Sequence, residues 1–382
     1  MKREGTFNIF GVKIEFGWQS TNKIGLISES FNGKKALIVT DTGVQRLGYP
    51  QQVSEILKKK KIESYIHNDI SSNPTDKEVI KGATIYRDER CDFIIGIGGG
   101  SPMDAAKGIS VMAVHDEPID QYYGVGVENI VNPLPPMILI PTTAGTGSET
   151  SRSGIITNTA KKRKEVLRSG MANVALVDPS LTLGMPPFLT AATGLDALSH
   201  NIEALETNVY NPIAEAIAYE GIRLIAQSLV RAVEDGTCQS AREDMAMASS
   251  MGALAFQKGL CISHSIAHQI SPMFGTHHGV AIAVTLPYTM EFNISAAPDK
   301  FSRIASAFGC ADPTPEKAVD EVRKLIKRIQ LPSSLSEIGV PKESLDEIAK
   351  NAMNDWCIKF NPKPVSEKDI NVLCQQAFNN RN

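Results

Sequence analysis

Apolar residues follow two different patterns along the 382-residue chain. In the first half, short and nearly continuous apolar runs alternate with stretches in which apolar residues recur at helical spacing. Such runs are typical of strands buried on both faces, with helices covering a parallel sheet. The pattern predicts an α/β domain over residues 1–186. Its expected strands lie within 34–41, 91–100, 136–149 and 173–181, and its expected helices within 49–62 and 101–113.

The pattern changes at the paired prolines Pro186 and Pro187. Beyond them, apolar residues recur at the spacing of amphipathic helices, and strand-like runs nearly vanish. Because proline interrupts regular structure, we place a domain boundary at this pair. Residues 187–382 are therefore expected to form a second, all-helical domain.

Composition and charge argue against several kinds of partner. The chain has 39 basic and 42 acidic side chains and a formal net charge of −3, so nothing draws it to nucleic acid or to an anionic membrane. No apolar run reaches the ~18 residues of a membrane span. The charged, alternating segment 1–17 does not resemble a signal peptide. The six cysteines form no CxxC pair, which favours reduced thiols and a cytoplasmic location.

A glycine cluster follows the second expected strand and is the first sign of chemistry. Gly98, Gly99 and Gly100 let backbone amides approach a phosphate, and the helix that begins there offers free N–H groups. Ser101 is an expected N-cap, Pro102 suits the first helical position, and Asp104 suits a capping box, so that Ser101 and Asp104 join the cofactor-binding candidates. A tight turn with no ligand is the alternative interpretation, since a glycine cluster alone is a weak motif.

A second polar loop strengthens the nucleotide interpretation. The segment 141–149 follows a different strand and carries two glycines and four hydroxyl groups, those of Thr142, Thr143, Thr146 and Ser148. Two such loops at strand ends of one sheet would form a crevice for a dinucleotide.

Asp41 ends the first expected strand and is the candidate for reading the cofactor's ribose. Its carboxylate would accept hydrogen bonds from ribose hydroxyls and repel a 2′-phosphate, which favours NAD over NADP. A role as helix cap or turn residue is equally compatible with the local sequence. Asp41 precedes the glycines, whereas the usual Rossmann acid follows them, so the sheet is expected to be Rossmann-like with different wiring.

Four of the seven histidines lie within residues 259–279, and a fifth lies upstream, close in sequence to a carboxylate. Asp196 and His200 are four residues apart, as are His264 and His268, which places each pair on one face of a helix. Such a mixed oxygen and nitrogen set suits a divalent ion, either Fe(II) or Zn(II). The alternative for the first pair is a carboxylate that merely orients an imidazole.

The motifs GGGSPMDAAK, PTTAGTGSE, ATGLDALSHNIEA and HSIAHQ…HHG occur in this order. With them, the chain resembles the iron-containing (group III) alcohol dehydrogenases over essentially its whole length. The resemblance implies a Rossmann-like dinucleotide-binding domain, an all-helical metal domain in a dehydroquinate synthase-like architecture, and a cleft between them. It assigns the metal to Asp196, His200, His264 and His278, and places His268 near nicotinamide and substrate as a non-ligand. Asn73 and Lys162 are further expected cofactor contacts.

Several residues depart from the family pattern. His277 stands where proline is usual and is interpreted as a polar loop residue. The alternatives are that it supports the metal ligands or is itself an alternative ligand. The segment 161–173 is unusually charged and is interpreted as a solvated loop, with contact between Arg163 or Arg168 and an anionic substrate as the alternative. Arg152 is interpreted as a structural ion-pair member, with a substrate-facing position as the alternative. The stretch GLCISH also differs from the family.

The expected reaction is reversible hydride transfer between NAD(H) and a small primary alcohol or aldehyde. The metal would act as a Lewis acid on the substrate oxygen, and His268 would relay the proton. One alternative is a dehydroquinate synthase-like lyase that uses NAD and a metal. Another is a non-catalytic sensor of NAD or metal. The family resemblance also implies a homodimer or a larger homo-oligomer.

Overall fold

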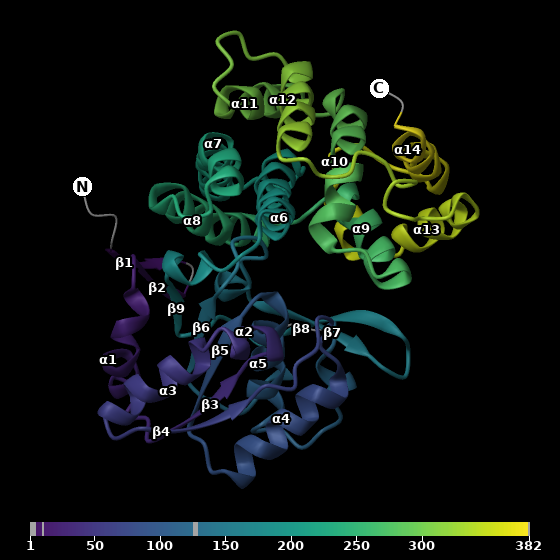
Figure 1. The fold of residues 1–382 in the computed structure, drawn as a ribbon. Helices are drawn as coiled ribbons and strands as arrows, with labels where there is room; N and C mark the ends of the chain where they lie inside the picture. Colours follow the sequence, from purple (N-terminus) through teal and green to yellow (C-terminus); the bar gives the residue numbers. More distant parts are fainter. Residues whose placement is uncertain (1–4, 10, 125–128, 381–382) are drawn as a thin grey trace. The chain divides into compact units, whose positions relative to one another are not determined.

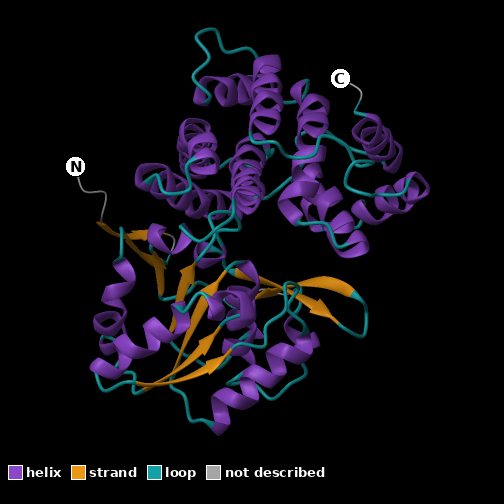
Figure 2. Ribbon diagram, in the orientation of Figure 1, coloured by secondary structure: helices purple, strands orange, loops and turns teal. Residues whose placement is uncertain are grey.

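The computed structural model describes residues 5–9, 11–124 and 129–380. It consists of two compact units. One comprises Met1–Thr143 and Gly147–Gly184, and the other comprises Ala144–Thr146 and Met185–Asn382. The first unit contains the strands and the second is built from helices (Figures 1 and 2). Three residues of the second polar loop thus group with the helical unit.

The first unit is organised around one twisted sheet with the strand order β1-β2-β9-β6-β5-β3-β4. All neighbouring strands are parallel except β1, which pairs antiparallel with β2. This confirms the predicted parallel α/β fold. The strands are β1 (Gly5–Ile9), β2 (Val12–Phe16), β3 (Lys35–Val39), β4 (Glu63–His67), β5 (Phe93–Gly98), β6 (Met137–Pro141) and β9 (Val174–Val177).

Side chains alternate between the two faces of this sheet, and helices cover both faces. On β3, Ala36 and Ile38 pack with α1 (Ile24–Glu29) and α3 (Tyr49–Lys59). The intervening Leu37 and Val39 pack with α4 (Asp76–Asp88) and α5 (Gly100–Met112). A strand that is buried on both faces needs apolar residues at every position, which is why these strands read as continuous apolar runs.

The chain path reverses beside β3. After β3 it forms β4 at the sheet edge, and it then crosses back to pair β5 with the other side of β3. The carboxyl ends of β3 and β5 therefore flank a topological switch point, which is where ligands bind in open α/β sheets. The short helix α2 (Thr42–Arg46) begins directly after β3.

The interpretation of residues 161–173 as a solvated loop was wrong for its first half. Arg163–Arg168 forms β8, which pairs antiparallel with β7 (Ser153–Asn158) in a separate two-stranded sheet. Within β8 only Leu167 is fully buried, opposite Gly154. Because β8 buries only one side chain fully, it needs few apolar residues, and its own sequence carries no strand signal.

The helical unit is formed by α6 (Pro187–Glu206), α7 (Pro212–Glu234), α8 (Gln239–Ala255), α9 (Ile262–Phe274), α10 (His278–Ile294), α11 (Pro298–Ala307), α12 (Pro315–Arg328), α13 (Leu345–Ala352) and α14 (Glu367–Asn379). Helix α6 is buried along nearly its whole length, from Thr190 to Glu206, and packs against α7, α8 and α10. Within the described residues, no helix combines the length and apolar character needed to cross a lipid bilayer.

Candidate functional site

Three helices of the helical unit bring the predicted metal ligands together. Asp196 and His200 lie one turn apart on the buried helix α6, and His264 lies near the start of α9. His278 is the first residue of α10, after the short turn that follows α9. Asp196, His200 and His264 offer donor atoms that all lie within 4.8 Å of one another.

The three imidazoles direct the same ring nitrogen toward one carboxylate oxygen. The Nε2 atoms of His200, His264 and His278 lie 3.8, 3.9 and 3.6 Å from Oδ1 of Asp196. These separations exceed hydrogen-bond length. They fit donor atoms that surround one ion, because two ligands at ~2.1 Å in tetrahedral geometry are roughly 3.4 Å apart.

The opposite nitrogen of each ring is close to an oxygen. His264 Nδ1 lies 2.6 Å from a carboxylate oxygen of Glu203, His200 Nδ1 lies 3.3 Å from the carbonyl oxygen of Gly145, and His278 Nδ1 lies 3.4 Å from the hydroxyl of Ser271. Metal-binding histidines usually donate their second N–H to such an acceptor, which orients the ring. All three rings therefore present Nε2 toward Asp196.

Two of the converging atoms have no partner although both are buried. Among the described residues, neither Asp196 Oδ1 nor His264 Nε2 has a hydrogen-bond partner. Leaving a buried polar atom unsatisfied costs on the order of 1–3 kcal/mol. A divalent ion would satisfy both atoms, so the residues present fit a metal site.

Glu203 is a functional residue that our sequence analysis missed. It is fully buried and accepts hydrogen bonds from the backbone N–H groups of Cys261 and His264 as well as facing the His264 ring. Burial lowers the pKa of His264, but the Glu203 carboxylate outweighs it and leaves that pKa raised. His200 Nδ1 faces the neutral carbonyl of Gly145 instead of a carboxylate, and burial lowers the pKa of His200 to about 4. Glu203 lies seven residues after Asp196 on the same face of α6, and this spacing is the signal that could have identified it.

Backbone contact between α6 and α10 explains the glycine after the last predicted ligand. A Cβ atom built at Gly279 would lie 1.9 Å from the carbonyl oxygen of Ala192. Only glycine allows the two helices to approach so closely. The close approach of the two helices keeps the His278 side chain next to Asp196.

The other two histidines of the segment differ from the three converging ones. His268 lies one turn after His264 on α9, and its ring stacks on His278 with the centroids 5.5 Å apart. Its Nδ1 is 2.8 Å from a carboxylate oxygen of Asp355, a residue for which the sequence carries no local signal. The side chain of His277 is exposed, and its backbone forms the N-cap of α10.

The predicted nucleotide-binding residues of the first unit gather at the carboxyl ends of three neighbouring strands. Asp41 follows β3, Gly98 ends β5, and the Thr142 N–H donates to the Gly98 carbonyl. A Cβ added at Gly99 would lie 3.6 Å from the side chain of Thr143. The Ser101 hydroxyl donates to the carbonyl of Ser72, beside Asn73. The predicted capping was wrong, because Gly99 is the N-cap of α5 and α5 begins at Gly100. Since Gly99 has no side chain to cap the helix, the first N–H groups of α5 stay available to an anion.

Asp104 and Ser148 make contacts that differ from those of a phosphate loop. Asp104 accepts hydrogen bonds from the Ser148 hydroxyl and the Ile155 N–H. The fully buried Lys107 donates to Ser148 and to the carbonyl of Ser153. These contacts fasten α5 to the start of β7.

The remaining predicted cofactor contacts lie elsewhere. Lys162 is exposed in the turn between β7 and β8, and Thr146 groups with the helical unit. Arg152, Arg163 and Arg168 are exposed around the same hairpin, and Arg163 pairs with Glu165 at 2.7 Å.

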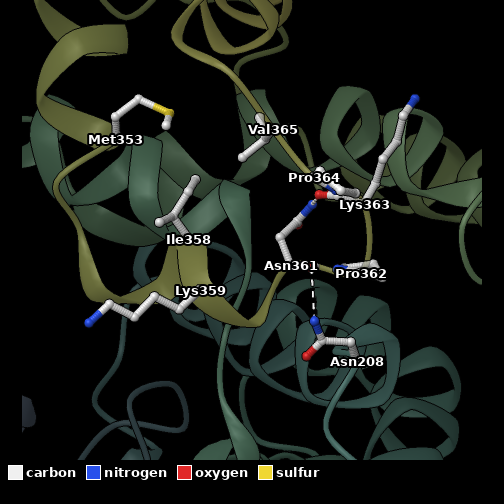
Figure 3. A pocket seen from close by; sticks show the side chains of 9 residues that line it. All are labelled: Asn208, Met353, Ile358, Lys359, Asn361, Pro362, Lys363, Pro364 and Val365. Atoms are coloured by element: carbon white, nitrogen blue, oxygen red, sulfur yellow. Dashed lines mark hydrogen bonds between the residues drawn. The ribbon is translucent and has the colours of Figure 1, made fainter.

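The helical unit also has a surface cavity of about 350 Å³. It opens between the end of α13 and the start of α14, where Lys359, Lys363 and two prolines line it, and Asn208 donates to the Asn361 carbonyl (Figure 3). None of the predicted site residues lines it, so it plays no part in the candidate site.

Comparison with known proteins identifies the family. Residues 11–179 match the model of the iron-containing alcohol dehydrogenases, and residues 190–378 match that of the C-terminal part of the Fe-containing alcohol dehydrogenase family. The chain is 38% identical to the 1,3-propanediol dehydrogenase of Klebsiella pneumoniae over 95% of its length and 96% of that protein. It is 35% identical to the NAD-dependent methanol dehydrogenase of Bacillus methanolicus, over 95% and 97% of the two chains.

A solved structure of a 1,3-propanediol oxidoreductase has the same fold. It superposes with a TM-score of 0.93 at 36% identity, covering 99% of this chain and 100% of the other. The agreement extends over both family models and nearly the full length of each relative. The chain belongs to the iron-containing alcohol dehydrogenase family.

Proposed function

We propose that the protein is an NAD-dependent, metal-dependent oxidoreductase that interconverts small primary alcohols and aldehydes. The observation that carries this proposal is the convergence of three histidine Nε2 atoms on one oxygen of Asp196, within 4 Å and with no hydrogen bond on that oxygen among the described residues. The family's named members include a propanediol and an NAD-dependent methanol dehydrogenase, which supports the same reaction class.

Asp196, His200, His264 and His278 would hold the ion. When bound, a divalent ion acts as a Lewis acid and polarises the oxygen of an alcohol or aldehyde. Three imidazoles and one carboxylate suit Fe(II) and Zn(II) alike. We favour Fe(II), because the family is named for its iron.

The first unit would bind NAD(H) at the switch point of its sheet. The glycines before α5 and the free N–H groups of its first turn would receive the pyrophosphate. Asp41 uses one carboxylate oxygen to cap α2, through the Val44 N–H at 2.9 Å. Its second oxygen has no hydrogen bond among the described residues and would be able to accept from the ribose. Asn73, Thr142 and Thr143 border the same strand ends.

His268 would move the proton that accompanies hydride transfer. Its ring lies beside His264 and His278, and its side chain is 20% exposed whereas that of His264 is 1% exposed. Imidazole titrates near neutral pH. In alcohol oxidation, Nε2 of His268 would accept the proton of the substrate hydroxyl and then release it to solvent. The carbon that bears the hydroxyl would give its hydride to NAD, which supplies the hydride acceptor when it is bound.

The test is anaerobic NADH oxidation by metal-stripped protein to which Fe(II) or Zn(II) has been restored. We expect turnover with small aldehydes such as propanal or lactaldehyde only when metal is present, faster with Fe(II). Aldehydes that bear carboxylate, phosphonate or sulfonate groups test whether the arginines near β7 and β8 matter. NADH binding without turnover on any aldehyde would contradict the proposal and favour a lyase or a sensor.

A further inference from the structure

His268 is held by a carboxylate from a distant part of the chain. Its Nδ1 lies 2.8 Å from Oδ2 of Asp355, a residue 87 positions further along. Asp355 precedes the short 3-10 helix η8 (Trp356–Phe360), and its other oxygen, Oδ1, accepts the Cys357 N–H at 2.9 Å. Both side chains are largely shielded, with 20% of His268 and 11% of Asp355 exposed.

Asp355 itself is firmly anchored. Cys357 is fully buried, and the segment is fixed at its other end, where a Cβ at Gly259 would lie 2.4 Å from the Phe360 ring. Burial would raise the pKa of Asp355, but the neighbouring His268 and the Cys357 N–H lower it overall. The carboxylate is therefore ionised at neutral pH and is purely an acceptor.

We infer that Asp355 is a positioning residue for the reaction, fixing the orientation and the tautomer of His268. An acceptor at Nδ1 requires the proton to sit on Nδ1, which leaves the lone pair on Nε2. The ring then presents an acceptor nitrogen on its other side, beside His264 and His278. This inference rests on the proposed function, in which His268 handles the substrate proton.

The carboxylate is required because both of its oxygens are in use. An asparagine at 355 has a single acceptor oxygen, which can serve either the Cys357 N–H or the His268 ring. The oxygen should stay with Cys357, because a backbone N–H cannot relocate its proton whereas the imidazole can. The amide NH₂ then faces Nδ1, and the ring carries its proton on Nε2. The Asp355→Asn variant thus keeps the shape of the residue while reversing the tautomer of its neighbour.

The experiment compares Asp355→Asn, Asp355→Glu and Asp369→Asn in the metal-loaded enzyme. Asp369 is a partly exposed residue of the capping box at the start of α14, so its variant removes the same chemical group and one charge elsewhere in the helical unit. Histidine-selective ¹⁵N labelling reports the ring tautomer, with His268→Ala used to assign the signal. Turnover, KM for NADH and metal content are measured on the same samples.

We expect Asp355→Asn to shift His268 toward the Nε2–H tautomer and to lower kcat about 100-fold or more. KM for NADH and metal content should not change. Asp355→Glu should recover a large part of the rate, and Asp369→Asn should behave like the parent protein. An unchanged tautomer in Asp355→Asn would overturn the inference. So would a fall in kcat that is explained by lost metal and that Asp355→Glu does not reverse. The tautomer is measured without substrate and therefore tests the role of Asp355 independently of turnover. Absence of turnover in the parent protein would contradict the proposed function and not the role of Asp355.

Discussion

The α carbon of Gly279 rests against the carbonyl oxygen of Ala192, where an added Cβ would lie only 1.9 Å from that oxygen. One contact therefore sets the distance between α10, which begins with His278, and α6, which carries Asp196 and His200. The metal-binding geometry depends on the backbone of two crossing helices as much as on the ligands themselves.

Replacing Gly279 with alanine should push α10 away from α6. Because the new Cβ would meet a backbone carbonyl and neither atom can rotate away, we expect a loss of about 3 kcal/mol or more in unfolding free energy and weaker metal binding. Urea unfolding and metal analysis after dialysis test this. Gly184→Ala is the matched control, since its nearest neighbour lies 3.6 Å away. Equal metal retention in the two variants would contradict the explanation.

Glu203→Gln should weaken metal binding without removing a ligand. The glutamine keeps the size of the side chain but loses the charge that orients His264 and raises its basicity. Loss of such a supporting partner typically lowers metal affinity 10–100-fold, and competition with a chelator of known affinity measures it. An unchanged affinity would mean that the carboxylate serves packing alone.

The two histidines one turn apart on α9 should respond differently to alanine. His264→Ala should lose bound metal, because His264 Nε2 points toward Asp196. His268→Ala should retain its metal while kcat falls about 100-fold or more. Metal analysis alongside steady-state kinetics separates the two effects. If His268→Ala loses metal as well, the roles assigned to the pair are wrong.

Asp41 should determine the choice between NADH and NADPH. Asp41→Gly removes the negative charge that would repel a 2′-phosphate, and Asp41→Ser does so while still capping α2. For both variants we expect the ratio of kcat/KM for NADPH to that for NADH to rise about tenfold or more. Continued discrimination by both variants at the parent's level would show that another residue reads the ribose.

Glu215 should make the stability of the helical unit sensitive to acid. Burial raises its pKa, but Lys258, Arg303 and Lys300 outweigh burial and lower it to about 2 from 4.5. A depressed pKa stabilises the fold above pH 4.5, and this contribution disappears as the pH falls from 4.5 toward 2. Glu215→Gln should therefore cost about 2–3 kcal/mol at pH 7 and much less near pH 2. A gap in unfolding free energy that stays constant with pH would contradict this.

Much of the site follows from spacing along the chain. The separation of four residues between Asp196 and His200, and between His264 and His268, is enough to place each pair on one helix face. The continuous apolar strands and the glycines after β5 likewise predict a parallel sheet with its ligand edge at the strand ends. Such features are local, so sequence alone carries them.

By itself, the sequence determined the fold class, the family and the chemically active residue types. Only the tertiary structure decided that Asp355 meets His268, that the Gly145 carbonyl faces His200, and that Asp104 and Ser148 fasten α5 to the start of β7. It also showed that the charged residues 163–168 form a strand. The reason is physical. Helix periodicity and strand burial leave a repeating mark on neighbouring residues, whereas a contact between distant segments depends on how whole elements pack and leaves none.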